Sequence, residues 1–184
     1  MKKVLAVLIA AVMVLSLAGC ELFPKEKPFS VDEMLITLTD AFAEAEFEGY
    51  TKAFDSRKAA VFVLREDKAL LNGVELSLAE YAELTKAANA NRGPGEIKTE
   101  DGLTYFEYES FGSDEQTIYS YFTTMFESKD AFWLVQFTGL RSEYEKLRPE
   151  FVKYAQSVTF GDAAPSDTAP SESQTGGEAG GQAQ

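Results

Sequence analysis

The middle of the chain opens with short apolar segments that have the period of β-strands. Met34–Thr39 is rich in β-branched residues and predicts a first strand. Residues 50–54 and 60–64 flank the polar turn 55–58 and predict a hairpin. The second of these strands is almost wholly apolar, which indicates that both of its faces are covered and that it lies centrally in its sheet.

A helical pattern follows the loop that we predict at residues 66–76. Ser77 and Glu80 form an S-x-x-E capping box, in which the Ser77 side chain accepts from the Glu80 amide and the Glu80 carboxylate reaches back. Apolar positions then recur at helical spacing until asparagines and Gly93-Pro94-Gly95 stop the pattern. The recurring positions are Leu78, Tyr81, Leu84, Thr85 and Ala88.

From Ile97 onward the hydrophobic period is two, which is typical of strands. Residues 97–100 and 103–111 flank Asp101-Gly102, the strongest two-residue hairpin signal. Two more strands are predicted at 117–126 and 131–137. Their aromatic residues point to both sides, so we expect an antiparallel meander with cover on both faces.

A second S-x-x-E pattern, at residues 142–145, predicts a closing helix whose apolar stripe runs from Leu147 to Val158. Pro149 interrupts this pattern. Because proline is tolerated only in a first helical turn, we expect either a helix that starts near Lys146 or a short turn that precedes a second helix.

The N-terminal residues 1–19 have the layout of a secretory signal peptide, with Lys2 and Lys3 ahead of an uncharged apolar run. That run is too short for a transmembrane span, which needs about 20 apolar residues. Leu17-Ala18-Gly19-Cys20 resembles the lipobox of bacterial lipoproteins, in which the cysteine becomes the first mature residue and its sulfur carries diacylglycerol. We therefore predict lipidation of Cys20, with palmitate among the acyl chains, and recognition of Leu17, Ala18 and Gly19 by signal peptidase II. The alternative is an ordinary signal peptide followed by a free, buried cysteine.

These patterns divide the chain into four parts. We predict a lipoprotein signal peptide at 1–19, a membrane tether at 20–28, a folded domain at 29–160 and a disordered low-complexity tail at 161–184. The tail lacks Lys and Arg and, prolines aside, has no apolar residue larger than Ala, so it cannot offset its ordering entropy by burial. A wall-spanning or partner-binding arm is the alternative to a solvated tail of no fixed role.

The amino-acid composition excludes several kinds of catalytic and metal site. The 184 residues contain no His and a single Cys, which excludes Ser-His-Asp and Cys-His nucleophile pairs, an internal disulfide and a Cys/His zinc site. A formal net charge of -13 argues against nucleic acid as a partner. Phosphate-loop, dinucleotide-binding and nucleophile-elbow motifs do not occur. No catalytic residue, cofactor or metal ligand is assigned.

Carboxylates are the first remaining candidate chemistry. Glu107 and Glu109 share one strand face and Asp114-Glu115 lies in the next turn, so the four could converge on a calcium ion. The competing interpretation, which we favour, is a solvated strand face. The same interpretation applies to the alternating Glu44, Glu46 and Glu48.

Aromatic residues are the second candidate. Trp133, Phe132, Tyr119 and Tyr121 could line an apolar or carbohydrate-stacking groove. Aromatic residues in long strands more often belong to the core of a small sheet protein.

The order of the elements resembles that of the PsbP-like superfamily, specifically its small lipoproteins from Gram-positive bacteria. The resemblance covers residues 29–160 and rests on the pattern at 36–38 and 40–42, the mid-chain helix, the aromatic meander and a terminal helix that ends at 157–160. It implies an α+β fold in which an antiparallel β-sheet of about six strands is flanked by helices as an α/β/α sandwich. Members of the superfamily serve as accessory or binding modules and share no active site, so the resemblance transfers no catalytic residue.

The resulting hypothesis is a lipid-anchored extracytoplasmic binding or accessory module without catalysis of its own. The lipid on Cys20 would hold it to the cell membrane, where an envelope protein is its expected partner. Two alternatives remain from other classes. One is a carboxylate-based cell-surface hydrolase, and the other is a calcium-dependent adhesion module.

Overall fold

The computed structural model of the chain describes residues 24–71 and 74–161. The predicted signal peptide, the lipobox with Cys20 and the tail from residue 162 lie outside these residues. Within the described part, no helix is long and apolar enough to cross a membrane.

A seven-stranded antiparallel sheet forms the centre of the domain, with the strand order β3-β4-β5-β9-β8-β7-β6. The predicted segment 60–64 lies in β5, which pairs with β4 on one side and β9 on the other, so its central position is confirmed. The strands are β3 (Ala43–Ala45), β4 (Lys52–Asp55), β5 (Ala59–Asp67), β6 (Lys98–Glu100), β7 (Leu103–Phe111), β8 (Ile118–Glu127) and β9 (Ala131–Leu140).

The hairpin predicted at Asp101-Gly102 joins β6 to β7. Both residues have positive φ, 52° for Asp101 and 78° for Gly102, as a two-residue turn that matches the strand twist requires. The turn residues therefore determine the register at this edge of the sheet.

A separate three-stranded sheet has the order β1-β2-β10, formed by β1 (Glu26–Val31), β2 (Met34–Thr39) and β10 (Thr159–Phe160). The predicted strand at 34–39 is thus present, but it is not the first. β1 precedes it and starts within the segment that the sequence suggested as a membrane tether. Only Phe29 and Val31 of β1 are buried, and such a short alternation beside charged residues and Pro28 is a weak signal.

Helix α2 (Leu78–Ala88) has the boundaries that its sequence signals predict. The Ser77 hydroxyl accepts from the Glu80 amide at 3.3 Å, and the Glu80 carboxylate accepts from the Ser77 amide at 2.8 Å. Asn89 caps the other end. Short 3-10 helices lie before α2 (Lys68–Leu71), after it (Ala90–Arg92) and before α3 (Arg141–Glu143).

The predicted closing helix is present and the short 3-10 helix Arg141–Glu143 precedes it, but it begins at Tyr144 and not near Lys146, so Pro149 lies beyond its first turn. α3 (Tyr144–Gln156) is a single helix with Pro149 inside it, and Glu143 stands at its N-cap without a side-chain cap. Tyr144, Leu147 and Phe151 are buried against the sheet, and this packing holds the first turns together although Pro149 removes one backbone hydrogen bond. Pro149 itself is exposed, so its ring displaces no neighbouring element.

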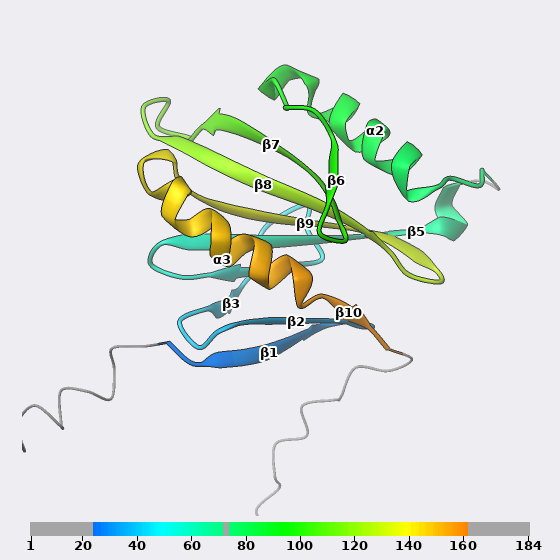
Figure 1. Ribbon diagram of the computed structural model, residues 1–184, viewed down its shortest axis with the longest axis horizontal. Coiled ribbons are helices and arrows are strands. Elements are labelled where there is room, and N and C mark those ends of the chain that lie inside the picture. Colours follow the sequence, from blue (N-terminus) through cyan, green and yellow to red (C-terminus); the bar gives the residue numbers. More distant parts are fainter. Residues whose placement is uncertain (1–23, 72–73, 162–184) are drawn as a thin grey trace, which may run out of the picture.

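The large sheet is covered on both faces (Figure 1). One face, which we call the α3 face, packs against α3 and the small sheet, and the opposite face, the α2 face, packs against α2. The predicted α+β class, an antiparallel sheet flanked by helices, is confirmed, with seven strands in the main sheet. Central residues of the α3 face are Phe54, Val61, Val63, Phe122, Trp133, Val135 and Phe137, and those of the α2 face are Phe106, Tyr108, Met125, Phe132 and Leu134.

Candidate binding site

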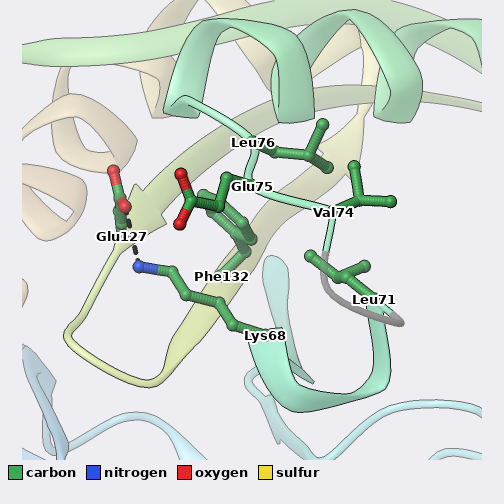
Figure 2. A pocket seen from close by; sticks show the side chains of 7 residues that line it. All are labelled: Lys68, Leu71, Val74, Glu75, Leu76, Glu127 and Phe132. Atoms are coloured by element: carbon green, nitrogen blue, oxygen red, sulfur yellow. Dashed lines mark hydrogen bonds and ion pairs between the residues drawn. The ribbon is translucent and has the colours of Figure 1, made fainter.

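A pocket of about 460 Å³ opens between the end of β5, the segment that leads into α2 and the β8–β9 turn (Figure 2). Phe132 forms its floor. The Tyr81 ring of α2 stacks on Phe132 with centroids 4.5 Å apart, which fixes the phenyl ring against the sheet. Seven residues line the pocket: Lys68, Leu71, Val74, Glu75, Leu76, Glu127 and Phe132.

Lys68 closes one end of the pocket. Its ammonium donates to Glu127 Oε1 at 2.7 Å, to the Ser128 carbonyl at 2.8 Å and to the Lys129 carbonyl at 3.4 Å. Because an ammonium has three donors, Lys68 is fully engaged in tying the end of β5 to the β8–β9 turn. The lysine therefore shapes the pocket and has no donor left for an anionic ligand.

The opposite side of the pocket is apolar. Val74 is 57% exposed, and Leu70 next to the pocket is 75% exposed, which is unusual for side chains of this size. Figure 2 shows the Glu75 carboxylate pointing toward the side of Glu127. An apolar floor and wall with Glu75 and the Lys68-bound Glu127 at the opening, one excess negative charge in all, suit an apolar group that carries a positive charge beside it.

The aromatic groove does not form, and Phe132 and Trp133 belong to the core, as the favoured interpretation predicts. Phe132 and Trp133 are neighbours on β9 and therefore point to opposite faces of the sheet. Trp133 is fully buried on the α3 face, where its indole N–H donates to Ser128 Oγ at 3.2 Å. Of the four predicted residues, Phe132 lies in the pocket, and Tyr121 stacks on Tyr108 at 4.6 Å elsewhere on the α2 face.

The four carboxylates predicted as a possible calcium site do not converge. Arg148 donates to Glu107 Oε1 at 3.0 and 2.8 Å, and the Tyr144 hydroxyl donates to Glu107 Oε2 at 2.8 Å. Glu109 forms an ion pair with Arg141 at 2.9 Å. In residues 24–71 and 74–161 no group of three or more acidic or cysteine side chains is placed to hold a metal ion.

The Asp114 carboxylate stabilises the turn in which it lies. Its carboxylate accepts from the Thr117 hydroxyl and from the backbone amides of Gln116 and Thr117, and these bonds lower the pKa of Asp114 to about 2. The carboxylate is therefore ionised, but its oxygen atoms are already used within the loop.

Tyr144 and Arg148 show how Glu107 binds α3 to the sheet. Burial and the nearby Glu107 raise the pKa of Tyr144, and the hydrogen bonds from Arg148 to Glu107 raise the pKa of Arg148. Both shifts keep the side chains protonated as donors to Glu107.

Glu44, by contrast, pairs with Lys52 on an exposed edge, and Glu46 and Glu48 are exposed, as the interpretation of a solvated face predicts.

Most residues of the pocket were missed by sequence reasoning, which treated residues 66–76 as a loop. Leu70, Leu71, Val74 and Leu76 form an unusually apolar loop directly before the capping box of α2. That concentration is the signal that could have indicated a surface site.

No protein-family model and no curated protein matches this chain. Among solved structures, cyanobacterial PsbP (CyanoP) from Synechocystis sp. PCC 6803 is 14% identical, with 78% of this chain and 96% of that chain covered and a TM-score of 0.48. LpqN, described as involved in cell envelope biogenesis of Mycobacterium tuberculosis, is 12% identical, with 73% and 90% covered and a TM-score of 0.45.

A crystal structure from Bacteroides thetaiotaomicron is 11% identical, with 70% of this chain covered and a TM-score of 0.47. The match spans 45% of that longer chain. A PsbP structure is therefore among the solved structures similar to this chain. The likeness concerns the fold alone and transfers no residue role.

Proposed function

We propose that the chain is a lipid-anchored accessory module on the outer face of the cell membrane, which binds a partner through the pocket at Phe132. It carries out no catalysis of its own. The lipid would be attached at Cys20, and Leu17-Ala18-Gly19 would direct processing there.

The placement of the pocket relative to the ends of the domain carries this proposal. β1 and β10 both pair with β2, so the two ends of the domain leave from the small sheet (Figure 1). α2 lies on the other side of the large sheet. The stretch between Cys20 and Glu26 reaches about 3.5 Å per residue at most, so a lipidated Cys20 would keep the small sheet near the bilayer. The α2 face would then be directed away from the membrane, where a partner has access to it.

The lipid is needed because charge would not hold this domain at a membrane. The chain has 30 Asp and Glu against 17 Lys and Arg, and anionic head groups repel such a surface. Two or more acyl chains provide stable anchoring independently of charge.

The state of the carboxylates favours binding over hydrolysis. A glycoside hydrolase of the predicted kind needs two carboxyl groups with different pKa values on either side of a cleft. Glu107 and Glu109 are instead paired with arginines on the α3 face, and Glu127 is paired with Lys68. The pocket offers an apolar cavity whose charged lining, Glu75 together with the Lys68–Glu127 pair, has one excess negative charge, which suits a partner segment with a leucine-like side chain next to Lys or Arg.

The anchor is tested by replacing Cys20 with Ser. We expect the variant to leave the membrane fraction and to appear in the soluble extracytoplasmic fraction. A variant that stays with the membrane as the wild-type protein does would refute the anchor.

The binding surface is tested by photo-crosslinking in intact cells, with the reactive amino acid at Leu70 beside the pocket or at Lys146 on α3. Both side chains are exposed, but they lie on opposite sides of the large sheet. We expect a discrete adduct from position 70 that is absent from position 146 and that Val74→Lys abolishes, because the added ammonium repels the expected basic segment. Equal crosslinking from both positions, or an adduct that survives Val74→Lys, would contradict the proposed surface.

A further inference from the structure

A hydrogen-bonded row of side chains lies on the α2 face beyond the end of α2. The Tyr50 hydroxyl donates to Gln136 Oε1 at 2.8 Å, and Gln136 Nε2 donates to the Tyr108 hydroxyl at 2.9 Å. Arg92 Nη1 donates to the same Tyr108 oxygen at 3.1 Å. The four side chains come from the segment before β4, from β9, from β7 and from the 3-10 helix after α2, so the fold alone brings them together.

The free hydrogen-bonding capacity of this row consists mainly of donors. Tyr108 accepts two hydrogen bonds, and its own hydroxyl proton has no acceptor within residues 24–71 and 74–161. Arg92 is exposed and uses Nη1 for Asn89 and Tyr108, and in the same part of the chain it forms no ion pair. The Tyr121 ring stacks on Tyr108 at an interplanar angle of 5°, which places another phenol beside the row.

The phenols of Tyr108 and Tyr50 remain protonated donors at neutral pH. Burial raises the pKa of Tyr108 to about 12, against the opposing effect of Arg92, and burial also raises the pKa of Tyr50. The charged and titratable groups that most affect the pKa of Tyr108 are Arg92, Tyr121 and Tyr50. The Arg92 end of the row therefore offers a guanidinium and hydrogen-bond donors, whereas the exposed carboxylates Glu46 and Glu48 flank Phe47 at the other end.

An aromatic platform continues the row on the side of Tyr50. The rings of Tyr50 and Phe62 lie 5.0 Å apart, and those of Phe62 and Phe47 lie 4.9 Å apart. Phe47 is 57% exposed, so this platform reaches solvent. Aromatic faces accept the C–H face of a sugar ring, whose hydroxyls remain free to bond to neighbouring polar groups.

We propose that this cluster is a binding site for an acidic carbohydrate. The sugar's oxyanion would accept hydrogen bonds from Arg92 and Tyr108, and a neighbouring ring would pack on Phe47 and Tyr50. The site is separate from the pocket at Phe132 and does not depend on the lipid anchor.

The test is a calorimetric titration of the full-length protein in non-ionic detergent with three probes. These are a hyaluronan tetrasaccharide, which carries glucuronate carboxylates, neutral chitotetraose and inorganic phosphate. We expect the hyaluronan tetrasaccharide to bind at least about tenfold more tightly than chitotetraose, since the oxyanion adds charge-assisted hydrogen bonds. Equal affinity for chitotetraose would overturn the role of the anion, and equal affinity for inorganic phosphate would overturn the role of the sugar.

Three variants connect the binding to the cluster. Arg92→Gln should weaken binding of the hyaluronan tetrasaccharide about 10- to 100-fold, because it removes a charged donor. Tyr121→Phe removes only a hydroxyl next to the row and should weaken binding about two- to tenfold. Lys129→Gln makes the same change of net charge in the exposed β8–β9 turn and should change affinity by less than about twofold. An Arg92→Gln protein that binds like the wild type, or one that loses no more affinity than Lys129→Gln, would overturn the site.

Discussion

Gly139 shows how closely the central layers approach each other. A Cβ atom built at this position of β9 would lie 2.5 Å from Leu147 Cδ1 of α3 and 3.1 Å from the Lys58 carbonyl. The glycine therefore serves close packing of α3 on the sheet.

We expect Gly139→Ala to lower the free energy of unfolding by about 1–3 kcal/mol, as overpacking of a well-packed core does. Urea unfolding followed by circular dichroism measures the change. Gly161→Ala is the matched control, since nothing lies within 4 Å of a Cβ at that position, and it should change stability by less than about 0.5 kcal/mol. Similar changes in the free energy of unfolding for the two variants would contradict this expectation, because they would mean that α3 can move away from β9 without loss of stability.

Individual side chains were the hardest features to predict from the pattern. Phe132 and Trp133 were considered together as lining one groove, although adjacent strand residues face opposite ways; both are core residues, as the favoured interpretation predicts, and only Phe132 also reaches a pocket. Gln136 and Arg92 drew no attention at all. A lone polar residue in an apolar strand acquires its meaning from cross-strand and cross-element partners, here Tyr50 and Tyr108, that no local pattern identifies.

The two segments 77–80 and 142–145 share the S-x-x-E pattern but have different outcomes. Ser77 caps α2, whereas Ser142 lies within the 3-10 helix Arg141–Glu143 that runs directly into α3. A capping box needs an extended N-cap residue, and Ser77 has ψ of 161°. Glu143, which precedes α3, has ψ of -6° and cannot act in that way.

We expect Ser77→Ala to lower the free energy of unfolding by about 1 kcal/mol, because it removes the acceptor for the Glu80 amide. Ser142→Ala is exposed and outside any cap, so its effect should stay below about 0.5 kcal/mol. Chemical denaturation of both variants under the same conditions measures the two changes in the free energy of unfolding. Equal losses would show that the second pattern caps a helix after all.

Elements with strong local signals were predicted well, and those held by packing were not. α2 has a cap at each end, and the β6–β7 hairpin has its Asp-Gly turn, so both were found at or close to their boundaries. β1 lacks such a signal and exists because Phe29 and Val31 complete the small sheet. α3 continues through Pro149 because its buried side chains hold it against the sheet.

The domain has two apolar cores that share one sheet. Alternate residues of β7, β8 and β9 enter the α3-face core and the α2-face core in turn. Loss of one core removes the support of the other, so the domain should unfold as one cooperative unit.

We expect the urea midpoints from Trp133 fluorescence and from far-ultraviolet circular dichroism to coincide. Trp133 is the chain's single tryptophan and reports on the α3-face core, whereas circular dichroism also records α2 on the other face. A helical signal that disappears at lower urea than the fluorescence change would show that the α2 layer unfolds independently.

The amino-acid sequence alone is enough to predict the α+β class, the capped helix, the aromatic meander and the limits that a lack of histidine places on catalysis. These follow from periodicity, turn chemistry and composition, which are local or additive properties. Folding decided which carboxylates are bound to arginines, that Phe132 forms the floor of a pocket, and that Tyr50, Tyr108, Gln136 and Arg92 meet. Such contacts depend on the strand register and on the position at which α2 ends above the sheet. Neither the register nor that position can be deduced from residues that are far apart in the sequence.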